Sequence, residues 1–165
     1  MGKLYLRPAE SADCHLLWEW ANENEVRKNS FHTEPIPLEE HEAWFKRILA
    51  DDSVKLYILQ DDNEQIGQVR LAYIGKWQIS YSIASAFRGQ GYGKIMLQMA
   101  ENELIRSGHV GESLWAEAKL SNIASRRIFE KLGYAEAASM HDDACAYQKQ
   151  VQPEIYDIDE IVHAN

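Results

Sequence analysis

The sequence predicts a single α/β domain with a mixed central β-sheet flanked by helices. Short segments in which apolar and polar residues alternate are typical of half-buried strands, and longer segments with apolar residues every three or four positions are typical of amphipathic helices. The two kinds of segment are interspersed along the chain, which favours a sheet with helices on its faces. With 165 residues, 45% of them hydrophobic, the chain has the size of one ordinary domain with a full core.

The first half of the chain is expected to contain one strand, two helices and then three strands. A short strand at residues 4–8 ends at a proline, a helix begins near Ser11, and a second helix begins at Leu38. The polar stretch at 22–30 between the helices fits either a broken helix or a loop. The three strands are expected at 54–59, 65–73 and 77–84.

The second half is expected to contain two more helices and three more strands. Ser121 or Asn122 can cap the second of these helices, and Gly133 can end it. The residues from Pro153 onward match no pattern, so the predicted domain spans 1–152 and the tail 153–165 has no predicted structure. The predicted elements are a helix at 91–106, a strand at 113–118, a helix ending at Gly133, and a hairpin of strands at 134–139 and 145–151.

The composition excludes several classes of function. A formal net charge of −9 argues against nucleic acid as a partner, because that affinity comes largely from Lys and Arg. No segment is long and apolar enough to span a membrane, and the N-terminus lacks the hydrophobic run of a signal peptide, so we expect a cytoplasmic protein without a membrane partner. Cys14 and Cys145 lack the spacing of metal ligands, and the histidines form no cluster, so no metal is expected.

Three glycines stand at every second position where a predicted strand gives way to a predicted helix. They are Gly89, Gly91 and Gly93, preceded by Arg88 and followed by Lys94. Glycine lets backbone amides approach a ligand closely, and the start of a helix adds unpaired N–H donors and the positive end of the helix dipole. The stretch therefore predicts a phosphate-binding site.

The spacing of these glycines excludes the two commonest phosphate-binding motifs. A P-loop has four residues between its first glycine and its Gly-Lys pair, followed by Ser or Thr, whereas here three residues separate Gly89 from Gly93 and Ile95 stands in the hydroxyl position. A dinucleotide-binding motif needs a third glycine where Lys94 stands.

The stretch instead resembles motif A of the GNAT family of N-acetyltransferases, in which Gln or Arg is followed, after two residues, by Gly-x-Gly or Gly-x-Ala. Arg88, Gly91 and Gly93 match this motif in full, and the order of predicted elements is that of the GNAT fold. The resemblance implies acetyl-CoA as cofactor, with its pyrophosphate on the glycine loop and its pantetheine arm along the preceding strand. The residues so assigned are Ile83, Ala84, Arg88, Gly89, Gln90, Gly91, Tyr92, Gly93 and Lys94.

Residues 114–134 resemble motif B of the same family, a strand followed by Asn and a helix that ends in Leu-Gly-Phe or Leu-Gly-Tyr. In the branch that acetylates ribosomal-protein N-termini, a glutamate stands five residues before the Asn, as Glu117 stands before Asn122. The resemblance implies that Asn122 and Ser125 contact coenzyme A and that Glu117 is the general base. The alternatives are a helix cap for Asn122, compatible with a ligand role, and a surface position for Glu117.

A carboxylate is useful here because an ammonium group cannot attack a thioester until it loses a proton. A positioned general base contributes on the order of 10²–10⁴-fold to such a step. Many GNAT enzymes also place a tyrosine seven residues after the Asn, to protonate the leaving thiolate, and this chain has Phe129 there. Because a thiol has a pKa of roughly 8.5, its thiolate can leave unaided. Water or Tyr134 is the alternative proton donor.

The motifs define the donor of the acetyl group, and residues 18–45 bear on the acceptor. This region resembles the branch that acetylates the 4-amino group of a UDP-linked amino sugar in pseudaminic-acid-type glycan synthesis. The shared features are a Trp-Asn-Arg-like run with Trp20, Asn22 or Asn24, and Arg27, and a segment with Glu40, His41, Trp44 and Phe45. The substrate-binding residues expected are Asn24, Arg27 and His32 in this region, together with Tyr81 on the strand predicted at 77–84.

Several alternatives to this assignment stay open. The aromatic residues of the region lie at helical spacing and fit a hydrophobic core equally well. A polyamine or a peptide N-terminus is the main alternative acceptor, and the acidic composition favours the polyamine. A non-catalytic sensor that binds acyl-CoA would keep the same fold. The oligomeric state is also open, a homodimer included.

Overall fold

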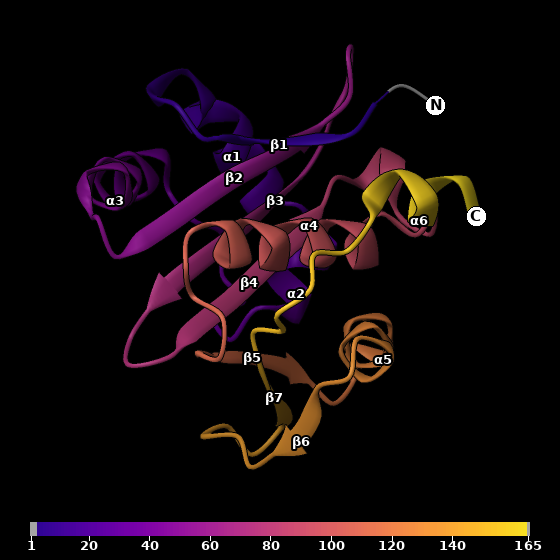
Figure 1. The fold of residues 1–165 in the computed structure, drawn as a ribbon. Helices are drawn as coiled ribbons and strands as arrows, with labels where there is room; N and C mark the ends of the chain where they lie inside the picture. Colours follow the sequence, from indigo (N-terminus) through magenta and orange to yellow (C-terminus); the bar gives the residue numbers. More distant parts are fainter. Residues whose placement is uncertain (1–2, 165) are drawn as a thin grey trace.

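A seven-stranded sheet in the order β1-β2-β3-β4-β5-β7-β6 forms the centre of the structure (Figure 1). The computed structural model describes residues 3–164. Neighbouring strands are antiparallel except β4 and β5, which are parallel, so the predicted mixed sheet is confirmed. The strands are β1 (Tyr5–Pro8), β2 (Val54–Gln60), β3 (Gln65–Tyr73), β4 (Trp77–Ile83), β5 (Ser113–Lys119), β6 (Ala135–Ala137) and β7 (Ala144–Gln150).

Helices cover both faces of this sheet. The polar stretch at 22–30 contains a short helix, the first of the two alternatives that the sequence left open. None of the helices within residues 3–164 is both long and apolar enough to cross a bilayer. The helices are α1 (Cys14–Ala21), α2 (Asn24–Asn29), α3 (Leu38–Ala50), α4 (Tyr92–Arg106), α5 (Ile123–Lys131) and α6 (Ile158–Ala164), with 3-10 turns at Ser11–Asp13 and Ser85–Phe87.

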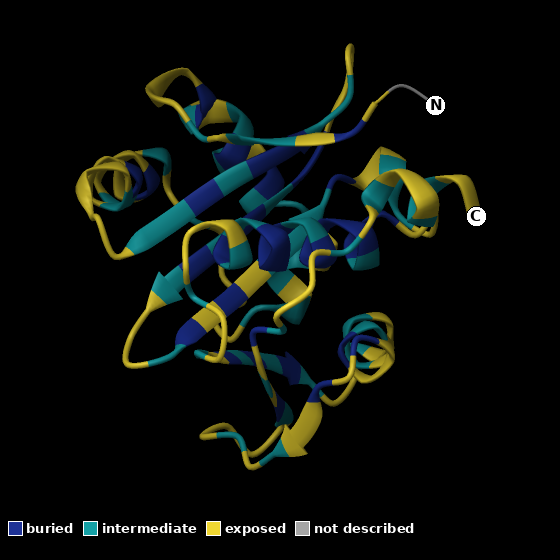
Figure 2. Cartoon of the chain, in the orientation of Figure 1, coloured by how far each residue is buried: buried dark blue, intermediate teal, exposed yellow. Residues whose placement is uncertain are grey.

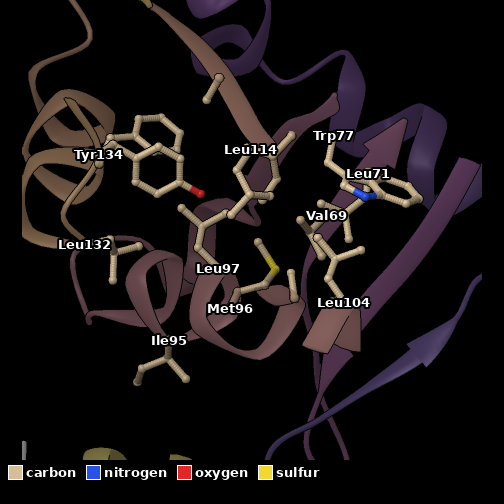
Figure 3. Packing of buried hydrophobic residues seen from close by; sticks show 14 of the residues in the cluster. Val69, Leu71, Trp77, Ile95, Met96, Leu97, Leu104, Leu114, Leu132 and Tyr134 are labelled. Carbon is tan, nitrogen blue, oxygen red and sulfur yellow. The ribbon is translucent and has the colours of Figure 1, made fainter. Parts of the chain in front are cut away.

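The larger core lies between α4 and the middle strands of the sheet (Figure 3). Met96 and Leu104 of α4 are fully buried and pack with Val69 and Leu71 of β3 and with Leu114 of β5. A smaller core on the opposite face joins α1 and α3 to β2. The two cores fix the sheet between α4 on one side and the α1–α3 layer on the other.

Buried and exposed residues alternate along the first part of β4, as the sequence pattern predicts (Figure 2). Trp77 and Ile79 belong to the α4-side core, whereas Gln78 and Ser80 are exposed on the other face. The parallel pairing of β4 with β5 covers only Trp77 and Gln78, opposite Leu114 and Trp115. Beyond Gln78, within the part of the chain that the structure describes, β4 therefore has no partner strand on its β5 side.

The C-terminal tail, for which the sequence suggested no structure, packs on α4 and ends in α6. Asn102 of α4 is buried, accepts a hydrogen bond from the Tyr156 amide at 2.8 Å and donates one to the Tyr156 carbonyl at 3.0 Å. Glu101 accepts from the Gln152 amide and from Lys149 Nζ, both at 3.0 Å. Two buried polar side chains of α4 thus hold the tail in place.

Candidate active site

The glycine loop presents a group of unbonded backbone amides at the N-terminus of α4. Gly91 is the N-cap of the helix with φ 86°, and Gly89 has φ 75°, both in the left-handed region that favours glycine. None of the amides of residues 89–94 donates a hydrogen bond to any described residue, and the first helical bond runs from the Ile95 amide to the Gly91 carbonyl at 3.4 Å. These donors, the helix dipole and Lys94 fit the pyrophosphate of a nucleotide cofactor.

Gly93 has a packing role in addition to its place in the motif. It lies buried in the first turn of α4, where a Cβ atom would come within 3.1 Å of Ile128 Cδ1 and 3.3 Å of Tyr81 Cε2. Glycine at this position therefore allows α4 to approach both β4 and α5. The second glycine of the motif thus brings the free amides close to the open edge of β4.

Arg88 and the neighbouring loop residues brace the loop. The Arg88 guanidinium forms an ion pair with Glu23 at 2.9 Å and donates to the Ile83 carbonyl at 3.0 Å. Gln90 is exposed, while Tyr92 is buried with its ring against Phe87. Among the predicted flanking charges, Lys94 makes no ion pair with the described residues, and Arg88 is partly neutralised.

Asn122 and Ser125 lie at the start of α5, beside the open edge of β4. The Asn122 side chain accepts from the Ser125 amide at 3.3 Å and so caps the helix. The Ser125 hydroxyl is 2.6 Å from the Tyr81 hydroxyl, which connects α5 to β4. Just after the end of β4, the Ala84 amide donates a hydrogen bond to the Ile66 carbonyl of β3 at 2.8 Å.

Glu117 lies on β5, next to the loop between β6 and β7 that carries Ser139 and His141. Its side chain is 12% exposed, and its Oε2 accepts a hydrogen bond from Ser139 Oγ at 3.2 Å and lies 3.7 Å from His141 Nε2. The His141 ring stacks on Phe31 with 3.7 Å between ring centroids. The carboxylate is thus shielded from bulk water, held in orientation, and connected through His141 and Phe31 to the layer formed by α1–α3.

A cavity of about 880 Å³ lies between the α1–α3 layer and the face of β2, β3 and β4. This volume suits a small-molecule ligand. Arg27, His32 and Tyr81 line it, as does Phe31, which contacts His141. Asn24 is exposed at the start of α2 and is not part of the lining.

The Arg27 side chain holds together neighbouring segments of the chain at the cavity through hydrogen bonds. Its Nε donates to the Ala21 carbonyl at 2.6 Å, and its Nη1 donates to the His32 carbonyl at 2.7 Å. Its Nη2 donates to Ser30 Oγ at 3.2 Å. Most of the guanidinium donors are therefore occupied by the protein itself, in a position where burial lowers the pKa of Arg27.

We expect Arg27→Ala to destabilise the fold, because three groups that it binds lose their donor. Because these hydrogen bonds come from a charged donor, we expect their loss to lower the free energy of unfolding by about 2 kcal/mol. For a chain of this size, that cost corresponds to a fall in Tm of roughly 4–8 °C. Differential scanning calorimetry measures the shift, and the KM for acetyl-CoA should hardly change. An unchanged Tm with a raised acceptor KM would instead assign the guanidinium to the acceptor.

Position 129, where many GNAT enzymes have a tyrosine, is part of the core. Phe129 is 2% exposed and packs against Tyr81, Tyr134 and Tyr147. Burial raises the pKa of Tyr134 strongly and that of Tyr81 to about 12. Tyr81 and Tyr134 therefore stay protonated near neutral pH, and each is a weaker acid than a free tyrosine.

The cysteines and the metal-binding side chains form no site in the described part of the chain. Cys14 and Cys145 are both free, and burial raises the pKa of the Cys14 thiol, so the reactive thiolate is disfavoured. Across residues 3–164, no three His, Cys, Asp or Glu side chains are grouped to hold a metal ion.

Three side chains near these sites were not predicted from the sequence. Ser139 was expected at the end of the strand 134–139 and His141 in the hairpin turn that follows, whereas β6 ends at Ala137 and only the folded chain brings both side chains to Glu117. Arg70 lines the cavity from β3, although it was not singled out. Its signal in the sequence is a charged residue between Val69 and Leu71, in a strand whose apolar and polar residues alternate there.

Comparison with known proteins gives a family and a set of related structures. The sequence profile of the acetyltransferase (GNAT) domain matches residues 3–135. The comparison with curated protein sequences gives no significant match. Similar solved structures include the spermidine N-acetyltransferase from Vibrio cholerae in complex with CoA and spermine, with a TM-score of 0.80, 17% identity, and coverage of 89% of this chain and 95% of that one.

Two further structures have the same fold. A ribosomal α-N-protein acetyltransferase in complex with coenzyme A has a TM-score of 0.79 and 17% identity over 93% of this chain and 97% of its own. An aminoglycoside acetyltransferase in complex with coenzyme A has a TM-score of 0.76 and 19% identity over 90% of this chain and 95% of its own. At identities this low, the similarity shows the fold alone.

Proposed function

The chain belongs to the acetyltransferase (GNAT) domain family, and we propose that it transfers the acetyl group of acetyl-CoA to the primary amine of a small molecule bound in the cavity. The observation that carries this proposal is the group of unbonded amides at residues 89–94, adjacent to the unpaired edge of β4. A pyrophosphate needs such donors, and a pantetheine arm can add to such an edge like an extra strand. The described residues therefore fit coenzyme A.

In the proposed reaction, acetyl-CoA supplies an activated acetyl group as a thioester. The Glu117 carboxylate accepts the proton of the acceptor's ammonium group, directly or through water, so that the nitrogen can attack. Ser139 and His141 hold the carboxylate in orientation. Amides on the unpaired edge of β4 are positioned to donate hydrogen bonds to the carbonyl oxygen as it gains charge.

For the acceptor, we propose an amino-sugar nucleotide. The cavity is large enough for a sugar with a phosphate substituent, and the Trp44 ring on its wall offers a surface for stacking. Three arginines line it, Arg27, Arg47 and Arg70, against two glutamates, Glu34 and Glu40. This balance is less suited to a polyamine such as the spermine bound to the Vibrio cholerae enzyme.

An acceptor screen with acetyl-CoA tests the proposed function. Released thiol is measured with UDP-linked amino sugars, spermidine, aminoglycosides and short peptides. We expect thiol release with the amino-sugar nucleotides and little with the polyamine or the peptides. Tight binding of acetyl-CoA without thiol release for any amine would favour a non-catalytic acyl-CoA sensor.

A further inference from the structure

Arg70 occupies a central position on the wall of the cavity. It lies on β3 between two residues that are buried toward α4, so its own side chain is directed to the opposite face of the sheet. There it lines the cavity, with its guanidinium carbon 5.2 Å from the centroid of the Trp44 ring. In the strand register, Arg70 is paired with Ser80 of β4, on the edge where acetyl transfer is proposed.

The Arg70 guanidinium is half-buried and has no anionic partner among residues 3–164. It donates no hydrogen bond and forms no ion pair there, and its one recorded contact is with the Trp44 ring. Three arginines elsewhere in the described residues do have an acidic partner: Arg7 with Asp13, Arg88 with Glu23, and Arg106 with Glu103.

None of the other charged groups that line the cavity neutralises the positive charge of Arg70. Arg27 is occupied by backbone carbonyls, and Arg47 is exposed on α3. Glu34 and Glu40 are exposed at the rim, and neither forms an ion pair with a described residue. Burial lowers the pKa of Arg70, although a guanidinium stays charged at any physiological pH.

A partly desolvated cation without a counter-charge is costly for the free protein and favourable for an anionic ligand. The planar fork of the guanidinium matches the geometry of phosphate and carboxylate, to which it can donate two parallel hydrogen bonds. Since the chain as a whole carries a net charge of −9, an anion in this cavity needs a local positive group.

We propose that Arg70 binds an oxyanion of the acceptor, a phosphate or a carboxylate, so that the preferred substrates are amines that also carry an acidic group. This inference rests on the proposed function and narrows it to a substrate class. Arg70 and Glu117 lie on strands separated by β4 in the sheet order. Two strand spacings amount to roughly 10 Å, and β4 and β5 are not paired with each other beyond Gln78 and Trp115 in the described chain, so this is a lower bound. The amine and the oxyanion must therefore be placed at opposite ends of the acceptor.

Matched acceptors test the proposal on the full-length protein. Glucosamine carries an amine alone, glucosamine 6-phosphate adds a phosphate on the far side of the ring from the amine, and 2-amino-2-deoxyglucuronic acid adds a carboxylate there. Acetylation of each is followed by thiol release for the wild type and for Arg70→Gln and Arg70→Lys. Arg106→Gln is the control, because it removes the same charge from an exposed position outside the cavity.

We expect the wild type to prefer at least one acidic acceptor over glucosamine by tenfold or more in kcat/KM, and the two acidic acceptors distinguish phosphate from carboxylate. Arg70→Gln should remove this preference by raising the KM for the acidic acceptors, with a smaller effect on glucosamine and the KM for acetyl-CoA nearly unchanged. Arg70→Lys, which keeps the charge and the aliphatic stem, should retain part of the preference. Arg106→Gln should behave as the wild type does.

Two results would overturn the proposal. One is a wild type that acetylates glucosamine or spermidine at least as well as the acidic acceptors. The other is an equal loss on neutral and acidic acceptors in the Arg70→Lys variant, which would indicate a structural role. A wild type that acetylates no amine at all would instead contradict the proposed function itself, so the two failures are distinguishable.

Discussion

Glu117→Gln is expected to lower kcat for acetyl transfer by roughly 10²-fold or more, with little change in the affinity for acetyl-CoA. Glutamine keeps the shape of the side chain and can still accept the hydrogen bond from Ser139, but it cannot take a proton. The loss should become smaller as the pH rises, because more of the amine is then already deprotonated. Steady-state kinetics across pH with the preferred acceptor measure both effects.

Glu136→Gln is a suitable control for this variant. Glu136 is exposed on β6, two strands from β5 in the sheet order, and its replacement removes the same charge without touching the Glu117 site. A Glu117→Gln enzyme with the wild-type kcat at neutral pH would place the base elsewhere. The polar face of β4, with Gln78, Ser80 and Ser82, acting through water is the alternative.

Gly91→Val is expected to weaken acetyl-CoA binding by roughly 10²-fold, since losing two hydrogen bonds of about 1.5 kcal/mol each corresponds to that factor. Gly91 has φ 86°, a conformation that a β-branched residue adopts only with strain. The space around its missing Cβ is empty, so the cost falls on the backbone and turns the amides of the loop away from the phosphates. Isothermal titration calorimetry with acetyl-CoA measures the loss.

Gly75→Val is the matched control for strain. Gly75 also has φ 86° and open space at its Cβ position, but it lies in the turn between β3 and β4, away from the glycine loop. Both variants should lose a similar amount of stability, and only Gly91→Val should lose affinity. Unchanged affinity in a folded Gly91→Val protein would remove the basis for assigning the loop to coenzyme A.

Most of the fold could be predicted because the main elements carry strong local patterns. The alternation along 77–84 and the glycines that follow it marked the junction of β4 with α4, and the strand at 65–73 was predicted with the bounds that the structure gives. The tail could not be predicted, because the segment that leads to α6 is held by hydrogen bonds from Gln152 and Tyr156 to Glu101 and Asn102, about fifty residues earlier in the chain. Such contacts leave no periodic signal in the tail itself.

The candidate site, like the fold, could be predicted where it depends on local sequence and could not where it depends on contacts between distant residues. The glycine loop was recognisable because Gly89 and Gly91 are needed for a local backbone conformation, whereas the packing role of Gly93 depends on the distant Ile128 side chain. The position of Arg27 suggested a ligand contact, yet its donors meet carbonyls that only the folded loop brings together. A charge in an alternating strand is visible in the sequence, but its lack of a partner is a property of the fold.

The central claim is that this chain moves an acetyl group from acetyl-CoA to the nitrogen of a small amine. Mass spectrometry of the acceptor after incubation with isotope-labelled acetyl-CoA, combined with quantification of released thiol, tests it most directly. We expect one labelled acetyl group on the amine nitrogen for each thiol released, with both lost together in Glu117→Gln. Thiol release without a labelled amine, or binding of acetyl-CoA with no release for any acceptor, would contradict it.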